Sequence, residues 1–105
     1  MLDISVKTFN QLSLEELYYI LQLRSEVFVV EQDCVYQDVD GKDQKATHII
    51  GKQDNKIIAY TRIFKAGDYF EEASIGRVVV SEKTRNKKYG HQLMVASIKA
   101  VETSF

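Results

Sequence analysis

The sequence predicts an α/β (α+β) domain in which helices cover a mostly antiparallel β-sheet. Three runs rich in β-branched residues follow one another closely, a pattern typical of neighbouring antiparallel strands. Two other segments carry apolar residues three or four positions apart, which is the spacing of an amphipathic helix. The expected elements are a strand at 3–9, a helix at 13–30, strands at 47–53, 56–65 and 73–80, and a helix that reaches Phe105. This order favours helices packed on one sheet.

The two helices and the first strand are indicated by local patterns. Ile4 and Val6 alternate with polar residues, as in a strand with one buried face. Ser13 and Glu16 have the spacing of a capping box, which begins a helix. The apolar stripe of this helix consists of Leu17, Leu21 and Phe28, with Ile20, Leu23 and Val27 beside it. In the last helix the residues that recur at helical spacing are Met94, Ile98, Val101 and Phe105.

Turn residues separate the later strands. Asp54 and Asn55 lie between the first two, and such a pair is typical of a tight β-hairpin. The Gly67–Asp68 pair ends the next run. Gly76 lies inside the last run, where a glycine indicates a bulge or a close approach of another backbone.

The composition is that of one ordinary globular domain. Of the 105 residues, 45% are hydrophobic and 28% charged, with a net charge of -1, which argues against a nucleic-acid partner. No apolar run is long enough to span a membrane, and the first residues lack the pattern of a signal peptide. Cys34 is the sole cysteine, so no intrachain disulfide can form. We therefore expect a cytoplasmic protein with no membrane partner.

Four basic side chains crowd the loop before the last helix, namely Lys83, Arg85, Lys87 and Lys88. Cations are disfavoured at this end of a helix because the helix dipole already places partial positive charge there. A bound phosphate or diphosphate would remove the repulsion and would also accept hydrogen bonds from the free N–H groups of the first turn. Gly90 lies in that turn, where a missing Cβ lets a ligand come close. In the alternative, Asn86 caps the helix and the lysines extend into solvent.

The segment VVVSEKTRNKKYGHQLM resembles the acyl-CoA-binding motif of the GNAT acetyltransferase superfamily, whose loop reads Arg/Gln-x-x-Gly-x-Gly/Ala. Arg85 opens the motif and Gly90 closes it, while Lys88 replaces the first glycine. The block LQLRSEVFVVEQDCVYQDVDGKD, followed by ATHIIG, IIAYTRIFK and IGRVVVSE, resembles the ElaA-like branch specifically. The resemblance covers roughly residues 14–101.

This resemblance implies acetyl-CoA as the cofactor. In GNAT proteins the strand before the loop splays from its neighbour and pairs with the pantetheine amides, and the loop wraps the diphosphate. The cofactor-binding residues implied here are Val78, Val79, Val80, Arg85, Asn86, Lys87, Lys88, Tyr89, Gly90 and His91. The Tyr89 side chain either stacks on the cofactor or packs on the sheet.

The resemblance also implies an N-acetyltransferase in which an amine attacks the thioester directly in a ternary complex. An N–H of residues 78–80 would polarise the carbonyl. Ser74 stands where some relatives carry a carboxylate base, and a serine cannot act as that base at neutral pH. The acid of many relatives is a tyrosine beyond the position of Phe105. We therefore assign no catalytic residue and expect residues 1–105 to be the amino-terminal portion of a single GNAT domain, without its carboxyl-terminal strands and helix.

Three residues are candidates for the side of the unidentified amine acceptor, namely Arg24, Phe28 and Arg77. Arg24 lies on the apolar stripe of the first helix, where it either extends its guanidinium to solvent, forms a salt bridge, or lines the acceptor site paired with Asp38 or Asp40. Arg62 and Arg77 each interrupt a strand, and either one can pair with an acidic loop residue in a structural role.

The remaining polar residues indicate no metal site. His48 and His91 are isolated, and DVDGKD lacks the glutamate that closes a calcium-binding loop. Cys34 is more typical of a packed small side chain than of a nucleophile.

Two rival functions stay open. An acyl-homoserine-lactone synthase shares the fold and an RxxxF pattern like that at 24–28, but this chain has Ser74 and no tryptophan where those enzymes favour glutamate and tryptophan. A CoA-binding module without turnover, or a homodimer joined through the exposed strand edge at 74–80, is the non-enzymatic alternative.

Overall fold

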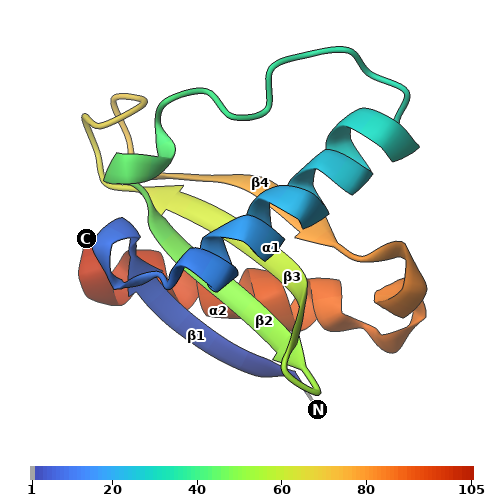
Figure 1. Cartoon of the computed structure of the whole chain (residues 1–105). Coiled ribbons are helices and arrows are strands. Elements are labelled where there is room, and N and C mark those ends of the chain that lie inside the picture. Colours follow the sequence, from blue (N-terminus) through green and yellow to red (C-terminus); the bar gives the residue numbers. More distant parts are fainter. Residues whose placement is uncertain (1) are drawn as a thin grey trace.

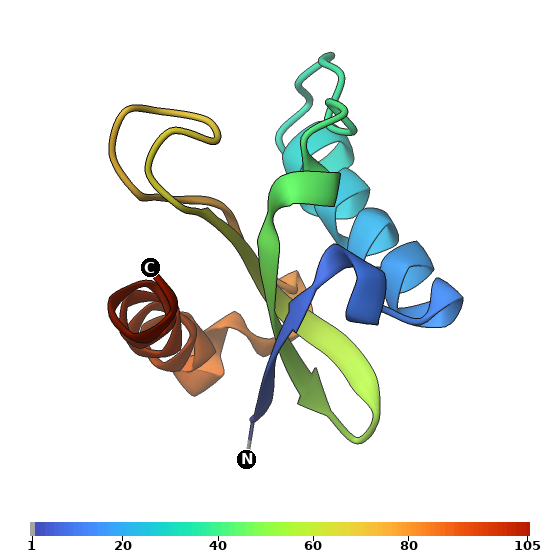
Figure 2. The ribbon, with the colours of Figure 1, turned by 90° about the vertical axis from the view of Figure 1, so that its left-hand side faces the viewer.

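Four antiparallel strands form one sheet, with a helix on each face (Figures 1 and 2). The computed structural model describes residues 2–105, except for the side chain of Asn86. The strands lie in chain order as β1 (Asp3–Thr8), β2 (Thr47–Gln53), β3 (Lys56–Phe64) and β4 (Ser74–Val80), and the α-helices are α1 (Leu14–Arg24) and α2 (Tyr89–Ser104). Short helical segments are η1 (Phe9–Gln11), η2 (Ser25–Glu31), η3 (Asp43–Lys45) and η4 (Glu82–Lys87). The expected fold class is confirmed.

The sheet separates two apolar clusters. The cluster on the α2 face contains Leu2, Ile49, Ile58, Ala59, Ile63, Tyr89, Leu93 and Ala100. The cluster on the α1 face contains Ile20, Leu23, Val27, Ile50, Tyr60 and Val79. Neighbouring residues such as Ile49 and Ile50 enter opposite clusters because side chains alternate along a strand. Both faces of β2 and β3 are therefore buried, which explains their nearly continuous apolar sequence.

The first helix has the expected extent but two geometries. The capping box is present: Glu16 N–H donates to Ser13 Oγ at 3.0 Å, and Ser13 N–H donates to Glu16 Oε1 at 2.9 Å. The α-helix ends at Arg24, and η2 continues it as a π-helix to Glu31. The π-helix is rare in proteins, and where it occurs it often lies at a functional site. No pattern in the sequence indicates this change of helix geometry.

The buried stripe of α2 differs from the apolar spacing noted in the sequence. The helix itself is confirmed, but the buried residues are Tyr89, Leu93, Ser97 and Ala100. Ile98 and Phe105 are 48% and 45% exposed. Ser97 occupies a core position because its hydroxyl forms a 2.7 Å hydrogen bond with Thr61 of β3.

The hairpin between β2 and β3 has the expected turn. Asp54 and Asn55 both have left-handed backbones, with φ of 53° and 65°, as a type I′ turn requires.

The described part of the chain contains no helix long and apolar enough to cross a membrane.

β4 carries a bulge, in which Arg77 and Val78 both lie opposite Thr61 of β3. The bulge expected near Gly76 is thus confirmed, but the left-handed residue is Arg77, with φ of 52°. Gly76 has open space where a side chain would begin, so no other part of the described chain approaches it closely. A left-handed backbone costs a non-glycine residue about 1–2 kcal/mol, so contacts elsewhere must hold Arg77 in this conformation.

Candidate functional site

Six charged side chains form a closed ring above the bulge of β4. Arginines and aspartates alternate around it, so every charge contacts two of opposite sign. Asp38 accepts from Arg24 Nε (2.9 Å) and Arg77 Nε (2.8 Å), Asp40 from Arg62 Nη2 (2.6 Å) and Arg77 Nη2 (3.4 Å), and Asp43 from Arg24 Nη1 (2.8 Å) and Arg62 Nη1 (2.9 Å). We call these six residues the charge ring.

The charge ring joins four segments that are distant in the sequence. Arg24 ends α1, Arg62 lies in β3 and Arg77 lies in the β4 bulge, while the three aspartates come from the segment that leads from η2 into η3. Two residues, Arg24 and Arg62, are 0% and 1% exposed. Arg24 therefore does not extend to solvent. It pairs with Asp38, as one expectation had it, but its second partner is Asp43 and not Asp40.

The ring favours the ionised forms of Asp40 and Arg24. Hydrogen bonds from Arg62 lower the pKa of Asp40 well below its usual range, and they outweigh the opposing effect of partial burial. Burial alone would lower the pKa of Arg24, but the hydrogen bond to Asp43 and the nearby carboxylate charges raise it instead. Removing one partner from such a buried set leaves an uncompensated charge, which is strongly destabilising.

Arg62 is the least satisfied member. Its guanidinium lies 5.2 Å from the ring centre of Phe64 and 5.8 Å from that of Tyr69. Its Nε is the buried side-chain N or O atom without a hydrogen-bond partner in the described part of the chain. A small cavity of about 220 Å³ borders Arg62, Gly76 and Arg77, beside the bulge.

A neutral histidine, His48, lies next to the charge ring and contacts the backbone of Asp43. His48 is fully buried, with Nε2 3.0 Å from the carbonyl oxygen of Asp43 and Nδ1 2.5 Å from the hydroxyl of Tyr60. Burial lowers the pKa of His48, so its imidazole is neutral at pH 7. Nε2–H then donates to the Asp43 carbonyl and Nδ1 accepts from Tyr60, whose pKa burial raises. Isolated in the sequence, His48 thus orders the backbone of Asp43.

β4 forms one edge of the sheet and leads into the basic loop. Val79 is buried on the α1 face, whereas Val78 is 41% exposed. Of the loop residues singled out in the sequence, Lys87, Lys88 and His91 are exposed. The side chain of Asn86, which one alternative expects to cap the helix, lies outside the described residues.

The start of α2 leaves its backbone donors without a side-chain cap. Lys88 is the N-cap residue, with a left-handed backbone (φ 62°) and no side-chain capping bond. Gly90 falls in the first turn as expected, and a Cβ there would lie 3.9 Å from Val80 Cγ2. Tyr89 packs in the core on the sheet, and its hydroxyl accepts a 2.8 Å hydrogen bond from Gln53. Of the two expectations for the Tyr89 side chain, packing on the sheet is confirmed.

Arg85 is held by two partners. Its Nη2 lies 2.6 Å from Glu31 Oε2 in a two-pronged ion pair, and its Nε donates to the Val80 carbonyl at 3.1 Å. The hydrogen bond from Arg85 lowers the pKa of Glu31. Nothing in the sequence singles out Glu31, because a carboxylate at the end of a helix gives no sign of a partner in a distant loop.

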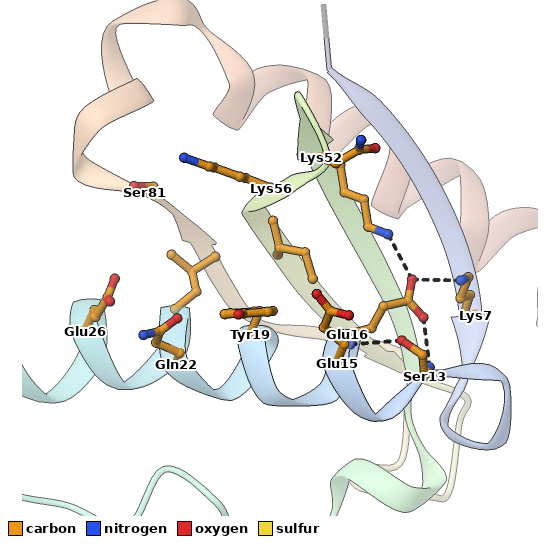
Figure 3. A pocket seen from close by; sticks show the side chains of 13 residues that line it. Lys7, Ser13, Glu15, Glu16, Tyr19, Gln22, Glu26, Lys52, Lys56 and Ser81 are labelled. Atoms are coloured by element: carbon orange, nitrogen blue, oxygen red, sulfur yellow. Dashed lines mark hydrogen bonds and ion pairs between the residues drawn. The ribbon is translucent and has the colours of Figure 1, made fainter.

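A second and larger cavity lies on the α1 face, away from the charge ring (Figure 3). Its volume is about 690 Å³, and α1 and the β2–β3 hairpin form its walls. At one end Glu16 Oε2 binds Lys7 at 2.8 Å and Lys52 at 3.1 Å (Figure 3). These contacts, with the Ser13 N–H bond, outweigh the effect of burial and lower the pKa of Glu16 to about 2. The two lysines are thus already engaged within the chain.

Within the described residues no cluster of histidine, cysteine and carboxylate side chains has the arrangement of a metal site. Cys34 is exposed, so the expectation of a packed small side chain is wrong at that position.

Comparison with known sequences identifies the family. The profile of the acetyltransferase (GNAT) family matches residues 13–104. Protein ElaA of Escherichia coli strain K12 is 51% identical over 87 residues, which cover 81% of this chain and 57% of ElaA. A UPF0039 protein of Schizosaccharomyces pombe is 42% identical over 104 residues, covering 98% of this chain and 66% of that protein. The chain thus spans a little over half the length of ElaA.

Solved structures agree with the sequence comparison. An acyl-CoA N-acyltransferase from Pseudomonas aeruginosa superposes with a TM-score of 0.94 at 42% identity, over 100% of this chain and 73% of that one. Escherichia coli ElaA superposes with a TM-score of 0.90 at 44% identity, over 96% and 70% of the two chains. With the matched profile, these similarities show that the chain belongs to the GNAT acetyltransferase family and to its ElaA-like members.

Proposed function

We propose that the protein is an N-acetyltransferase that uses acetyl-CoA and transfers the acetyl group to an amine. The observation that carries this proposal is the uncapped start of α2, which lies beside the end of edge strand β4 and within a basic loop. Free N–H groups, the helix dipole and exposed lysines together form a favourable environment for a diphosphate. A strand edge next to it offers backbone groups to the amides of pantetheine.

In this proposal the cofactor contacts β4 and the loop. The backbone of residues 78–80 pairs with pantetheine, and the N–H groups of the first turn of α2 bind the diphosphate. Gly90 provides the room for close approach, since the nearest described atom outside its own turn of α2, Val80 Cγ2, would lie 3.9 Å from a Cβ. Lys87 and Lys88 add charge, and Arg85 joins them once a phosphate replaces Glu31. Tyr89 contributes its backbone, because its side chain is in the core.

The chemistry follows from placing the two substrates together. The acceptor ammonium first loses one proton to solvent, and the free amine nitrogen then attacks the thioester carbonyl carbon and gives up a second proton as the C–N bond forms. The carbonyl oxygen takes negative charge in the tetrahedral intermediate, where a backbone N–H of the β4 bulge would stabilise it. The C–S bond then breaks, and the CoA thiolate takes up a proton.

The acceptor is proposed to approach from the side of the charge ring. Arg24 is fully buried and paired, so its proposed role is to fix the segment 38–43, without direct contact to the acceptor. Phe28 is half-buried at the end of the α1-face cluster, and the Arg77 side chain is 20% exposed. These two are the residues left to contact the acceptor. The lone exposed Cys34 supports a reducing, cytoplasmic setting.

A CoA-binding module without turnover is the second candidate. It is favoured by Ser74, which provides no base at the position where some relatives carry a carboxylate. Both candidates require the same donor site, so binding is tested before turnover.

The first experiment is calorimetric titration with acetyl-CoA, with dephospho-CoA and ADP as controls. We expect saturable micromolar binding that needs the diphosphate. The Gly90→Val variant, checked for folding by circular dichroism, serves as the matched negative. Absence of binding by a folded wild-type chain would overturn the proposal. Release of free CoA thiol in the presence of amines would then separate the enzyme from the module.

A further inference from the structure

Arg77 combines two features that are seldom found together. Its backbone is left-handed at φ 52°, although it is not glycine and lies inside a strand. Its guanidinium is fixed by Asp38, through Nε to Oδ1 at 2.8 Å and Nη2 to the carbonyl at 3.0 Å. Gly76, which would adopt such a backbone without strain, is the adjacent residue and does not adopt it. The strained backbone conformation is therefore found at Arg77, the residue whose side chain the charge ring holds.

Besides Asp38, two further residues, Asp40 and Tyr36, contact the guanidinium of Arg77. Asp40 Oδ2 lies 3.4 Å from Nη2, and the ring of Tyr36 lies 5.7 Å from the guanidinium carbon. Tyr36 also donates to Asp38 Oδ1 at 3.1 Å, which fixes the carboxylate that binds Arg77. The other two arginines of the charge ring hold these two aspartates: Arg24 of α1 binds Asp38, and Arg62 of β3 binds Asp40. Arg77 is thus tied to three elements of the fold.

We propose that the charge ring is a positioning device for the β4 bulge, in which Asp38 and Asp40 hold the left-handed backbone of Arg77 and so set the direction of the Val78 N–H. Two β4 residues opposite Thr61 turn the chain by an amount that depends on φ and ψ of Arg77. Thr61 is fixed from the other face by its hydrogen bond to Ser97. The bulge therefore lies between a rigid strand and the ring. Arg77 is a positioning residue here and not a catalytic one.

This inference rests on the proposed function insofar as the Val78 N–H faces a thioester. The structural part of the inference, that the charge ring holds the β4 bulge, does not depend on the proposed function. In the folded chain the ring also connects the segment 38–43, on the proposed acceptor side, to the strand on the donor side.

The test compares Arg77→Ala with Arg77→Gly in the ¹⁵N-labelled chain. Both variants remove the ion pairs, but only glycine adopts a positive φ without strain. If the ring holds the bulge, residue 77 of the alanine variant leaves the left-handed region. Its left-handed population relative to the glycine variant should fall roughly five- to thirty-fold. The three-bond coupling between the amide and α protons of residue 77, with the Val78 amide shift, reports this.

Asp38→Asn and Gly76→Ala complete the set. Asp38→Asn keeps shape and weakens the hold on Arg77, so the Val78 amide should shift in the direction seen in Arg77→Ala. Gly76→Ala adds a methyl group into open space one residue away and should leave the Val78 amide unchanged. A purely stabilising ring predicts equal bulge geometry in the alanine and glycine variants, and that result would overturn the inference.

Acetyl-CoA titration separates the two proposals. In the wild type, acetyl-CoA should move the Val78 amide resonance more than CoA does, and Arg77→Ala should reduce this difference while Arg77→Gly retains it. A wild-type chain that binds neither compound would refute the proposed function and the role of the ring at a transfer site, while the coupling constants would still decide whether the ring holds the bulge. Binding with equal Val78 shifts for the two compounds would overturn the positioning role alone.

Discussion

Arg85 and Glu31 lie 54 positions apart in the sequence and form a two-pronged ion pair, with Nη2 2.6 Å from Oε2. The pair connects the loop before α2 to the last residue of the π-helix η2. Arg85 is also the arginine that opens the loop motif, and it is proposed to bind the cofactor diphosphate. Glu31 therefore occupies the group that the proposed diphosphate contact needs, so binding in that mode would require an exchange of anions.

Glu31→Gln should strengthen CoA binding. The neutral amide holds Arg85 less tightly, and an exposed ion pair is worth little, so the expected gain in affinity is modest, up to about fivefold. Calorimetric titration with CoA at low and moderate salt measures it. Glu26→Gln, on the same segment but facing the large cavity, is the matched control and should leave affinity unchanged. Weaker binding by Glu31→Gln would mean that the pair shapes the site instead of competing for it.

Gly90→Ala should weaken CoA binding without weakening the fold. An added methyl group meets the nearest protein atom at 3.9 Å, an ordinary contact, and alanine favours a helix over glycine by about 1 kcal/mol. Urea unfolding should thus show equal or higher stability, while calorimetry shows reduced affinity, with Gly90→Val reduced further. Normal binding by the valine variant would contradict close approach of the ligand at this turn.

Arg24→Met should destabilise the chain by about 3–5 kcal/mol. Methionine fills a similar volume, but Asp38 and Asp43 each lose one of their two arginine partners, and the lost one is the fully buried Arg24. Urea unfolding followed by circular dichroism measures the change. Lys99→Met, at an exposed position of α2, is the control and should change stability by less than about 0.5 kcal/mol. A loss as small for Arg24 as for the control would show that the ring adds little to stability.

Stability should fall as the pH drops from about 4.5 to about 2, and Glu16 should account for part of this fall. Its pKa is lowered from 4.5 to about 2 in the folded chain, so the unfolded chain binds the proton more tightly. The stabilisation is complete above the unfolded pKa and is lost as the pH passes down through the folded one. Its size is on the order of 1–2 kcal/mol, because Lys7 and Lys52 are partly exposed.

Glu16→Gln tests this assignment. The variant should be less stable than the wild type at pH 7, and the difference should shrink toward pH 2. Glu15→Gln, on the same turn but exposed, is the control. A pH-independent difference between Glu16→Gln and the wild type would assign the effect to packing and not to charge.

The edge of β4 should make the chain self-associate at high concentration. β4 is the last strand of the described sheet, and an unpaired strand edge is a template for another chain. Light scattering over a concentration series measures the effect, and Val78→Lys, which places a charge on an exposed position of that edge, should reduce it. A monomer at all concentrations would contradict the prediction.

The sequence by itself determined the secondary structure and indicated an anion site before the last helix. Alternation and helical spacing located the four strands and two helices, because these patterns reflect which residues face the core. The capping box at Ser13 and the hairpin at Asp54 depend on residues only a few positions apart, so they were predictable. The run of cations before Gly90 indicated an anion site for the same local reason.

Only the tertiary structure decided how the charged residues pair. Arg24 could be matched with Asp38 from the sequence, but its second partner, Asp43, and the closure of the ring through Arg62 and Arg77 depend on four segments meeting in space. The same holds for Glu31 with Arg85, and for the left-handed backbone of Arg77 where a glycine stood next to it. Local patterns record burial, which is a property of one residue and its neighbours. Ion pairs between distant segments are properties of the assembled fold, since desolvation and partner geometry exist only once the chain has folded.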